Sequence, residues 1–280
     1  MLGAVWGASF LLLRIASPEF GPLALISLRL SVSALVLSPI IFLRREFPVV
    51  LANWRLFLWA GVFTSAFPFT LLSIVSLSMS AGNTSLLNAT VPMYSAIITW
   101  LWLKEKLNSI GIAGLVLGFI GVFVLASPEG GEYRTLLVPV LAATLGTICY
   151  AYGSCFTNLY LQGFKPITVT TGSQFYAALF MLPFGILFWP DSAPSTLSWI
   201  SAVSLGIFCT AMALIMFFRL LNQIGVTKSV SVAYLIPVFG ILWGAIFLHE
   251  VLTLKMIFGG ALILLGVFLT TRQPRVKVAA

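Results

Sequence analysis

Two polar side chains that could bind a small molecule stand inside apolar stretches of this sequence. Arg29 lies seven residues after Pro22 in a run of apolar and small residues. A charge in such surroundings is costly unless it is paired or solvated, so we expect Arg29 to bind a carboxylate. Asn88, in AGNTSLLNATVP, is the second candidate for contact with a substrate. Hydrogen bonding between helices is the alternative role for Asn88.

Aromatic side chains form a second group of candidates. Aromatic faces offer apolar area with a polar edge, and they attract an ammonium group by cation–π interaction. The alternative role for tyrosine and tryptophan is anchoring at the membrane interface. The aromatic set is Trp6, Tyr94, Tyr150, Tyr152, Tyr234 and Trp243. We expect all of these except Tyr150 to line the substrate-binding site.

Two prolines occupy the interior of predicted helices. Pro92 and Pro237 each stand about eleven residues into an apolar span. A proline there removes one backbone hydrogen bond and kinks the helix, and the freed carbonyl needs a neighbour or a water-filled cavity. We expect both prolines to act as hinges or cavity walls, with a purely structural kink as the alternative.

Two glutamates follow these prolines at the same distance. Glu105 lies thirteen residues after Pro92, and Glu250 lies thirteen residues after Pro237. Each stands where one helix ends and a short turn begins the next, so we expect both to stabilise a helix hairpin. His249 is the single histidine, and HEVLT has no second histidine for a zinc helix. We expect no metal, no cofactor and no catalytic set.

The elements that position these residues are predicted from composition. Of 280 residues, 60% are apolar and 8% are charged, whereas soluble domains carry about 25% charged residues. Apolar runs of this length predict membrane-spanning helices. The fold class is therefore an all-α polytopic membrane protein, with ten spans at about 1–17, 22–43, 56–78, 81–103, 109–126, 135–161, 168–189, 198–221, 226–248 and 254–271.

The loops between these spans alternate between the two sides of the membrane and differ in charge. One side receives Arg44, Arg45, Arg55, Lys104, Lys106, Lys165, Arg219, Lys228, Arg272, Arg275 and Lys277. The other receives Arg14, Arg29, Arg134 and Lys255, together with Glu19, Glu129, Glu132, Asp191 and Glu250. Lys and Arg favour the cytoplasmic side, so we expect a cytoplasmic C-terminus and N-terminus. The net charge of +8 reflects this topology, and no nucleic-acid partner is expected.

The sequence also repeats itself. Pro92 matches Pro237 and Glu105 matches Glu250 at a spacing of 145, and Gly121-Val122-Phe123 matches Gly266-Val267-Phe268. Each half holds five spans, and because five is odd the second half enters the membrane inverted. Inverted repeats are typical of secondary transporters, which bind substrate where the halves meet. We expect one repeat at 1–127 (helices 1–5) and another at 135–272 (helices 6–10).

Longer stretches resemble a known family. WGASFLLLRIA (6–16) and SAGNTSLLNATVPMYSAIITWLWLKEKLN (80–108) resemble the first EamA repeat of the drug/metabolite transporter superfamily. IGVTKSVSVAYLIPVFGILWGAIFLHEVLT (224–253) resembles the second, and the similarity covers the chain. It implies a ten-helix transporter of the bacterial inner membrane, often an exporter of amino acids or related metabolites. Uptake, facilitative transport and an intramembrane enzyme are the alternatives, the last lacking a catalytic set.

The first span is shorter than the resemblance requires. Trp6 has five residues before it, whereas about sixteen helical residues precede its counterpart Tyr152. A first helix of at most 17 residues is at the short limit for a membrane core of ~30 Å. We expect that the protein begins upstream of Met1. The alternative is that the first helix is truncated. Substrate identity, transport direction, coupling ion and oligomeric state are not determined by the sequence.

Overall fold

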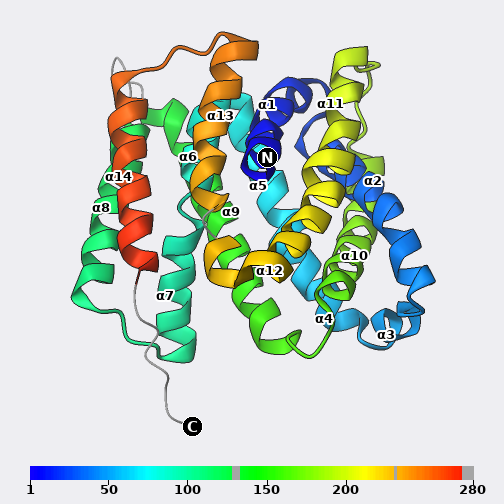
Figure 1. Ribbon diagram of the computed structural model, residues 1–280. Coiled ribbons are helices and arrows are strands. Elements are labelled where there is room, and N and C mark those ends of the chain that lie inside the picture. Colours follow the sequence, from blue (N-terminus) through cyan, green and yellow to red (C-terminus); the bar gives the residue numbers. More distant parts are fainter. Residues whose placement is uncertain (128–132, 230–231, 273–280) are drawn as a thin grey trace.

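The computed structural model describes residues 1–127, 133–229 and 232–272, and every regular element in that part of the chain is a helix (Figure 1). In a bilayer the backbone has no water to bond, so each segment must satisfy its own N–H and C=O groups, as a helix does. Of the charged residues in the loop comparison, Glu129, Glu132, Arg275 and Lys277 lie outside the described residues.

Helices occupy each of the ten predicted ranges, but several ranges are divided among two or three helices and the helix Phe47–Ala52 lies in none of them, so the count of ten helices is not confirmed. In the first half they are α1 (Leu2–Phe20), α2 (Pro22–Leu43), α3 (Phe47–Ala52), α4 (Trp54–Gly61), the π-helix η1 (Val62–Ala66), α5 (Phe67–Ser78), α6 (Ala81–Asn88), α7 (Val91–Leu103) and α8 (Ser109–Ala126). In the second half they are α9 (Tyr133–Tyr160), α10 (Pro166–Leu187), α11 (Thr196–Gly206), the π-helix η2 (Ile207–Met212), α12 (Ala213–Ser229), α13 (Val232–Leu248) and α14 (Leu254–Thr271).

Several of these helical segments can cross a membrane by length and composition. In the described part there are seven: Pro22–Leu43, Trp54–Ser78, Ala81–Leu103, Ser109–Ala126, Leu137–Tyr160, Thr196–Leu221 and Leu254–Thr271. Val232–Leu248 is a shorter apolar helix. The predicted spans at 1–17 and 168–189 overlap α1 and α10, which are not among the seven. The protein is therefore a multi-pass helical membrane protein.

The prediction that the first helix has at most 17 residues is wrong. The helix α1 has 19 residues, and Pro18 lies inside its last turn. It ends at Gly21, whose φ of 72° suits a residue without a side chain, and whose N–H donates to the carbonyl of Ser17 at 3.0 Å. The stop is thus set by the glycine and not by the proline.

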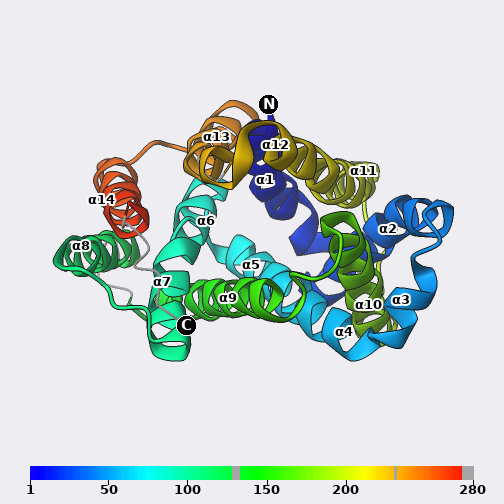
Figure 2. The same ribbon diagram turned by 60° about the horizontal axis from the view of Figure 1, so that its bottom comes forward.

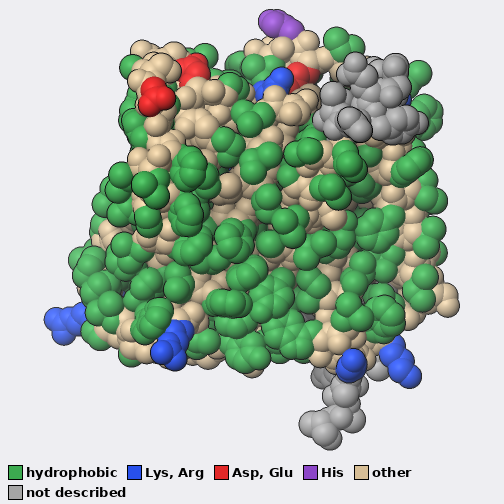
Figure 3. All heavy atoms as spheres, turned by 180° about the vertical axis from the view of Figure 1, so that it is seen from behind, with side chains coloured by type: hydrophobic (Ala, Val, Ile, Leu, Met, Phe, Trp, Pro, Cys, Tyr) green, Lys and Arg blue, Asp and Glu red, His purple; other side chains and the backbone are tan. Residues whose placement is uncertain are grey.

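The two ends of the helical bundle differ in charge (Figure 3). We call the end that carries the α13–α14 connection, with His249 and Glu250, the upper face. The lower face is the end that carries the α7–α8 connection, with Lys104 and Glu105. In this view most of the visible Lys and Arg side chains lie at the lower face, whereas the visible Asp, Glu and His side chains lie at the upper face, with one basic side chain among them.

Helices from the two halves of the chain pack against each other throughout the bundle. The pair α8 and α14 stands at one side of the molecule (Figure 2). Its backbones lie very close, because a Cβ added to Gly114 would be 2.7 Å from the carbonyl oxygen of Gly266. Elsewhere α2 packs on α10, α1 on α13 and α11, and α9 on α5 and α7.

Local features also recur at the spacing of 145 seen in the sequence. The π-helices η1 and η2 begin at Val62 and Ile207. Lys104 and His249, at the ends of α7 and α13, have positive φ angles of 58° and 54°. Asn108 caps the start of α8 and Thr253 caps the start of α14, each accepting a backbone N–H three residues on.

Candidate substrate-binding site

Arg29 is a buried cation inside the bundle. It lies on α2 and is 3% exposed. Its Nε donates to Oγ1 of Thr210 at 2.9 Å, and its guanidinium carbon lies 3.8 Å from the centre of the Phe69 ring. The one ion pair among the described residues joins Lys165 and Glu46, so no carboxylate in that part neutralises Arg29. A buried charge of this kind usually marks a functional site in a membrane protein.

Thr210 fixes how the guanidinium is held. It lies in η2, and π-helical turns frequently occur at functional sites. Its single hydroxyl proton goes to the carbonyl of Leu205 at 2.8 Å, so its oxygen lone pair faces Nε of Arg29. The two terminal nitrogens of the guanidinium make no hydrogen bond to the described residues.

A neutral pair stands at the corresponding place in the other π-helix. Nε2 of Gln174, on α10, donates to Oγ of Ser65, in η1, at 2.8 Å. Ser65 and Thr210 are 145 positions apart, as are Arg29 and Gln174. The side-chain oxygen Oε1 of Gln174 and the hydroxyl of Ser173 are buried and have no hydrogen-bond partner among the described residues. One half of the protein therefore places a cation beside its π-helix, and the other places an uncharged amide.

Tyr152 lies within an aromatic cluster. Its ring stacks on Trp102 with centroids 5.3 Å apart and planes 8° apart, and its hydroxyl accepts from Nε1 of Trp59 at 3.2 Å. Phe63 meets the same ring at 5.0 Å. This cluster therefore joins α9, which carries Tyr152, to α4, η1 and α7.

Trp6 and Trp243 lie near the contact of α1 with the second half. The Trp6 ring is 5.3 Å from Phe217 on α12. Nε1 of Trp243 donates to the carbonyl of Ala4 at 3.0 Å, which attaches α13 to α1. The helices approach closely here because Gly7 has no side chain, and a Cβ at this position would be 2.6 Å from Cβ of Phe239.

Tyr94 and Tyr234 face the α8–α14 pair. The ring of Tyr94 lies 5.6 Å from Phe119 on α8. The hydroxyl of Tyr234 shares a hydrogen bond of 2.6 Å with Oγ1 of Thr271 on α14. The contacts that hold Arg29 in place do not include either tyrosine.

Asn88 is the last residue of α6, at a break in the predicted fourth helix. Residues 89–90 are not helical, and Pro92 lies in the first turn of α7. The amide of Asn88 is half-buried and makes no hydrogen bond to the described residues. Pro237, by contrast, lies inside the continuous helix α13. The two prolines therefore have different surroundings in spite of their matching positions.

The two hairpin glutamates also differ. Glu250 accepts the backbone N–H groups of Ala81 at 2.7 Å and Gly82 at 3.3 Å, so it caps the first turn of α6. Glu105 is half-buried and makes no hydrogen bond or ion pair with the described residues. Glu19, for which the sequence predicted no role, behaves like Glu250, because it accepts from the backbone N–H and the hydroxyl of Ser195 before α11. Glu46 instead accepts from the side chains of Lys165 and Thr168.

The partners of Arg29 were not predicted from the sequence. Thr210 and Phe69 were missed because hydroxyl and aromatic side chains in apolar helices usually satisfy local roles. The available signal was the spacing of 145, which pairs Thr210 with Ser65 and Arg29 with Gln174. Polar residues at matching places in both halves would have indicated two corresponding but separate pairs, Arg29 with Thr210 and Gln174 with Ser65.

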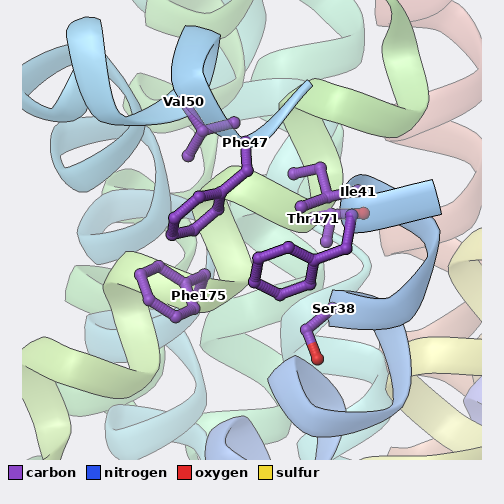
Figure 4. A pocket seen from close by; sticks show the side chains of 7 residues that line it. Ser38, Ile41, Phe47, Val50, Thr171 and Phe175 are labelled. Carbon is purple, nitrogen blue, oxygen red and sulfur yellow. The ribbon is translucent and has the colours of Figure 1, made fainter. Parts of the chain in front are cut away.

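Arg29 lines neither of two cavities in the described part of the bundle. A gap of about 10 Å³ between α2, α3 and α10 is lined by Phe47, Phe175 and their neighbours, and it is too small for a metabolite (Figure 4). A hollow of about 390 Å³ lies between α2, η1, α5, α9 and α10. Its lining is almost wholly apolar, with Leu23, Phe63, Phe67, Thr70, Leu71, Leu145, Cys149, Phe180, Met181 and Phe184. Among the described residues no three His, Cys, Asp or Glu side chains are placed to hold a metal ion.

Comparison with known proteins shows what this chain resembles. The model of the EamA-like transporter family matches residues 1–127 and again residues 137–272. An uncharacterized transporter of Archaeoglobus fulgidus is 27% identical over 96% of this chain and 95% of its own length. A probable terminal-alkyne amino-acid exporter of Streptantibioticus cattleyicolor is 26% identical over 96% of this chain and 90% of its own.

A solved structure has the same fold. It is a crystal structure of a protein that is 18% identical in sequence, and it aligns with a TM-score of 0.65 over 96% of both chains. At this identity the likeness concerns the arrangement of the helices alone.

Proposed function

The chain belongs to the EamA-like transporter family, and we propose that it exports amino acids or related amphipathic metabolites as a secondary transporter. The buried, unneutralised Arg29 carries this proposal. A cation held inside the membrane region by Thr210 and Phe69, with free terminal nitrogens, suits the carboxylate of such a substrate.

We propose further that transport occurs by alternating access between two inverted halves of five helices, 1–127 and 135–272. The two matches of the family model and the paired π-helices support this division. So do Lys104 and His249, which end their helices with the same backbone conformation. In this arrangement Asn88 and the aromatic candidates line the path, Pro92 and Pro237 are hinges, and Glu105 and Glu250 stabilise hairpins.

The charge difference between the faces supports a membrane orientation. Lys and Arg gather at the lower face, so that face is cytoplasmic by the positive-inside rule. The protein then lies in the cell inner membrane with both termini in the cytoplasm. Export moves substrate from the lower face toward the upper face. Uptake of another metabolite class by the same machinery is the alternative, and it differs only in direction.

The test compares the medium of cells that over-express the intact protein with the medium of cells that express Arg29→Gln at matched membrane abundance. Untargeted mass spectrometry should find one class of carboxylates that accumulates outside only with the intact protein. Media that do not differ between cells that over-express the intact protein and cells that lack it would overturn export. Accumulation that is equal for intact protein and variant would retain export but remove Arg29 from the site.

A further inference from the structure

We propose that Arg29 binds the substrate carboxylate end-on, that Thr210 positions Arg29 for this contact, and that the substrate amino group has no charged partner in the site. This inference rests on the proposed function, because it specifies which group of the substrate is recognised. The substrates that we infer for the protein are amphipathic monocarboxylates, with or without an amino group.

The geometry leaves one edge of the guanidinium free. Nε of Arg29 is hydrogen-bonded to Thr210, and the Phe69 ring covers one face of the guanidinium, with its centre 3.8 Å from the guanidinium carbon. What remains is the edge with the two terminal nitrogens, whose parallel N–H groups match the two oxygens of a carboxylate. Because the Thr210 hydroxyl proton is committed to Leu205, Thr210 can only accept from Arg29, and the orientation is fixed before substrate binds.

The charges around Arg29 indicate a monoanion. The nearby titratable groups that act on its charge are Cys209 and Tyr150, which are both uncharged at neutral pH. All the acidic residues in the described part lie in the last turn of a helix or in a connection: Glu19, Glu46, Glu105, Asp191 and Glu250. One carboxylate therefore neutralises the site, whereas a dianion would leave a buried negative charge.

The positions of the acidic residues also determine whether the amino group of the substrate has a charged partner. To recognise an ammonium group by its charge, the site would need a carboxylate in the interior of the bundle. None of the described residues supplies one there. An aromatic face or a neutral acceptor such as Asn88 can solvate the ammonium, but neither selects for it strongly against a substrate without one. Removing the amino group should therefore change affinity little.

The experiment measures binding to the purified full-length protein in detergent by the shift in its thermal unfolding. The probes are phenylalanine, 3-phenylpropanoate, which lacks the amino group, phenethylamine, which lacks the carboxylate, and phenylsuccinate, which carries two carboxylates. Each is used up to about 10 mM, roughly ten times the upper end of usual KM values. We expect phenylalanine and 3-phenylpropanoate to bind within roughly tenfold of each other, and the other two to bind much more weakly.

Several outcomes would overturn the inference. Binding of phenethylamine without binding of 3-phenylpropanoate contradicts carboxylate recognition. If phenylalanine binds much more than tenfold tighter than 3-phenylpropanoate, the amino group is recognised, which contradicts the proposal that it has no charged partner. Absence of binding by both monocarboxylates contradicts the substrate class. If both bind in vitro while no carboxylate is exported by cells, the site stands and the proposed direction of transport fails.

Variants test the role of Thr210 separately. Thr210→Val keeps the shape of the side chain but removes the acceptor, and we expect the Kd for 3-phenylpropanoate to rise by roughly tenfold. Thr210→Ser restores the hydroxyl and should restore binding. The matched control is Ser65→Ala, which removes the corresponding hydroxyl from η1 and should leave the Kd near the original value. An unchanged Kd in Thr210→Val, or no rescue by serine in a folded variant, would show that Thr210 does not position Arg29.

Discussion

The carboxylate of Glu250 accepts the backbone N–H of Ala81 at 2.7 Å, which attaches the α13–α14 connection to the start of α6. These residues are 169 positions apart in the chain. Gly82 donates to the other carboxylate oxygen at 3.3 Å. A negative charge at the start of a helix is favourable because the free N–H groups and the helix dipole both point toward it. Glu250 is thus a cap contributed by a distant hairpin.

Glu250→Gln should lower stability more than Glu105→Gln. Glutamine keeps one acceptor oxygen but loses the charge, which should cost about 1 kcal/mol at the start of α6. Glu105 caps no helix in the described part, so the hairpin that it stabilises should lose less stability when Glu105 is replaced. Thermal unfolding of the two purified variants in the same detergent measures the difference. Equal losses would mean that both glutamates stabilise hairpins alike, as the sequence alone suggested.

Much of the helical layout was predictable, because apolar runs and their turn residues determine where helices start and stop in a membrane. Pro22 and Pro166 begin α2 and α10, and polar caps such as Asn108 begin others. The spacing of 145 also predicted that Lys104-Glu105 and His249-Glu250 end corresponding helices. The bounds of α1 were the main error, because a glycine with positive φ and not the preceding proline ended that helix.

The site was less predictable than the helices. Arg29 was identifiable alone, since a charge in an apolar run is unusual. Its partner Thr210 is 181 positions away, and nothing local distinguishes that hydroxyl from others that bond their own helix. The matching prolines suggested equal hinges, yet the chain breaks before Pro92 and continues through Pro237. Such differences are set by tertiary packing, which cannot be predicted from the local pattern of a single sequence.

Gly7→Ala should destabilise the contact between α1 and α13. The added Cβ would lie 2.6 Å from Cβ of Phe239 and 2.9 Å from the backbone nitrogen of Gly240, so one helix must move. Overpacking of this kind costs roughly 1–3 kcal/mol. The control is Gly163→Ala, where the added Cβ meets no atom within 4 Å. The midpoint of thermal unfolding should fall for the first variant only, and an unchanged midpoint would show that the two helices separate easily.

Glu19 should make stability depend on pH at the upper face. Hydrogen bonds from the Ser195 backbone N–H, then from the hydroxyls of Ser198 and Ser195, hold the pKa of the Glu19 carboxyl below its ordinary value of 4.5. A carboxyl with a lowered pKa stabilises the folded state above its unfolded value, and this contribution is lost as the pH falls through the folded value. Glu19→Gln should therefore unfold at a lower temperature than the intact protein at pH 7.

The difference between these two proteins should shrink as the pH drops below about 4.5, the ordinary value for this carboxyl. Thermal unfolding at pH 7, 5 and 4 follows the trend, and the side chain is exposed, so the effect should be small and sensitive to salt. A gap between the two melting temperatures that widens in acid would contradict the direction argued here.

Asn88→Ala and Tyr234→Phe should separate transport from stability. The amide of Asn88 has no hydrogen-bond partner among the described residues, so its loss should reduce transport without reducing membrane abundance. The hydroxyl of Tyr234 is bonded to Thr271 at 2.6 Å, so its loss should lower stability by about 1 kcal/mol. Transport per folded molecule, measured as exported metabolite against membrane abundance, should then fall for Asn88→Ala and stay near normal for Tyr234→Phe. If Tyr234→Phe is fully stable but inactive, its hydroxyl contacts the substrate in another state of the transport cycle, and the bond to Thr271 is not its main role.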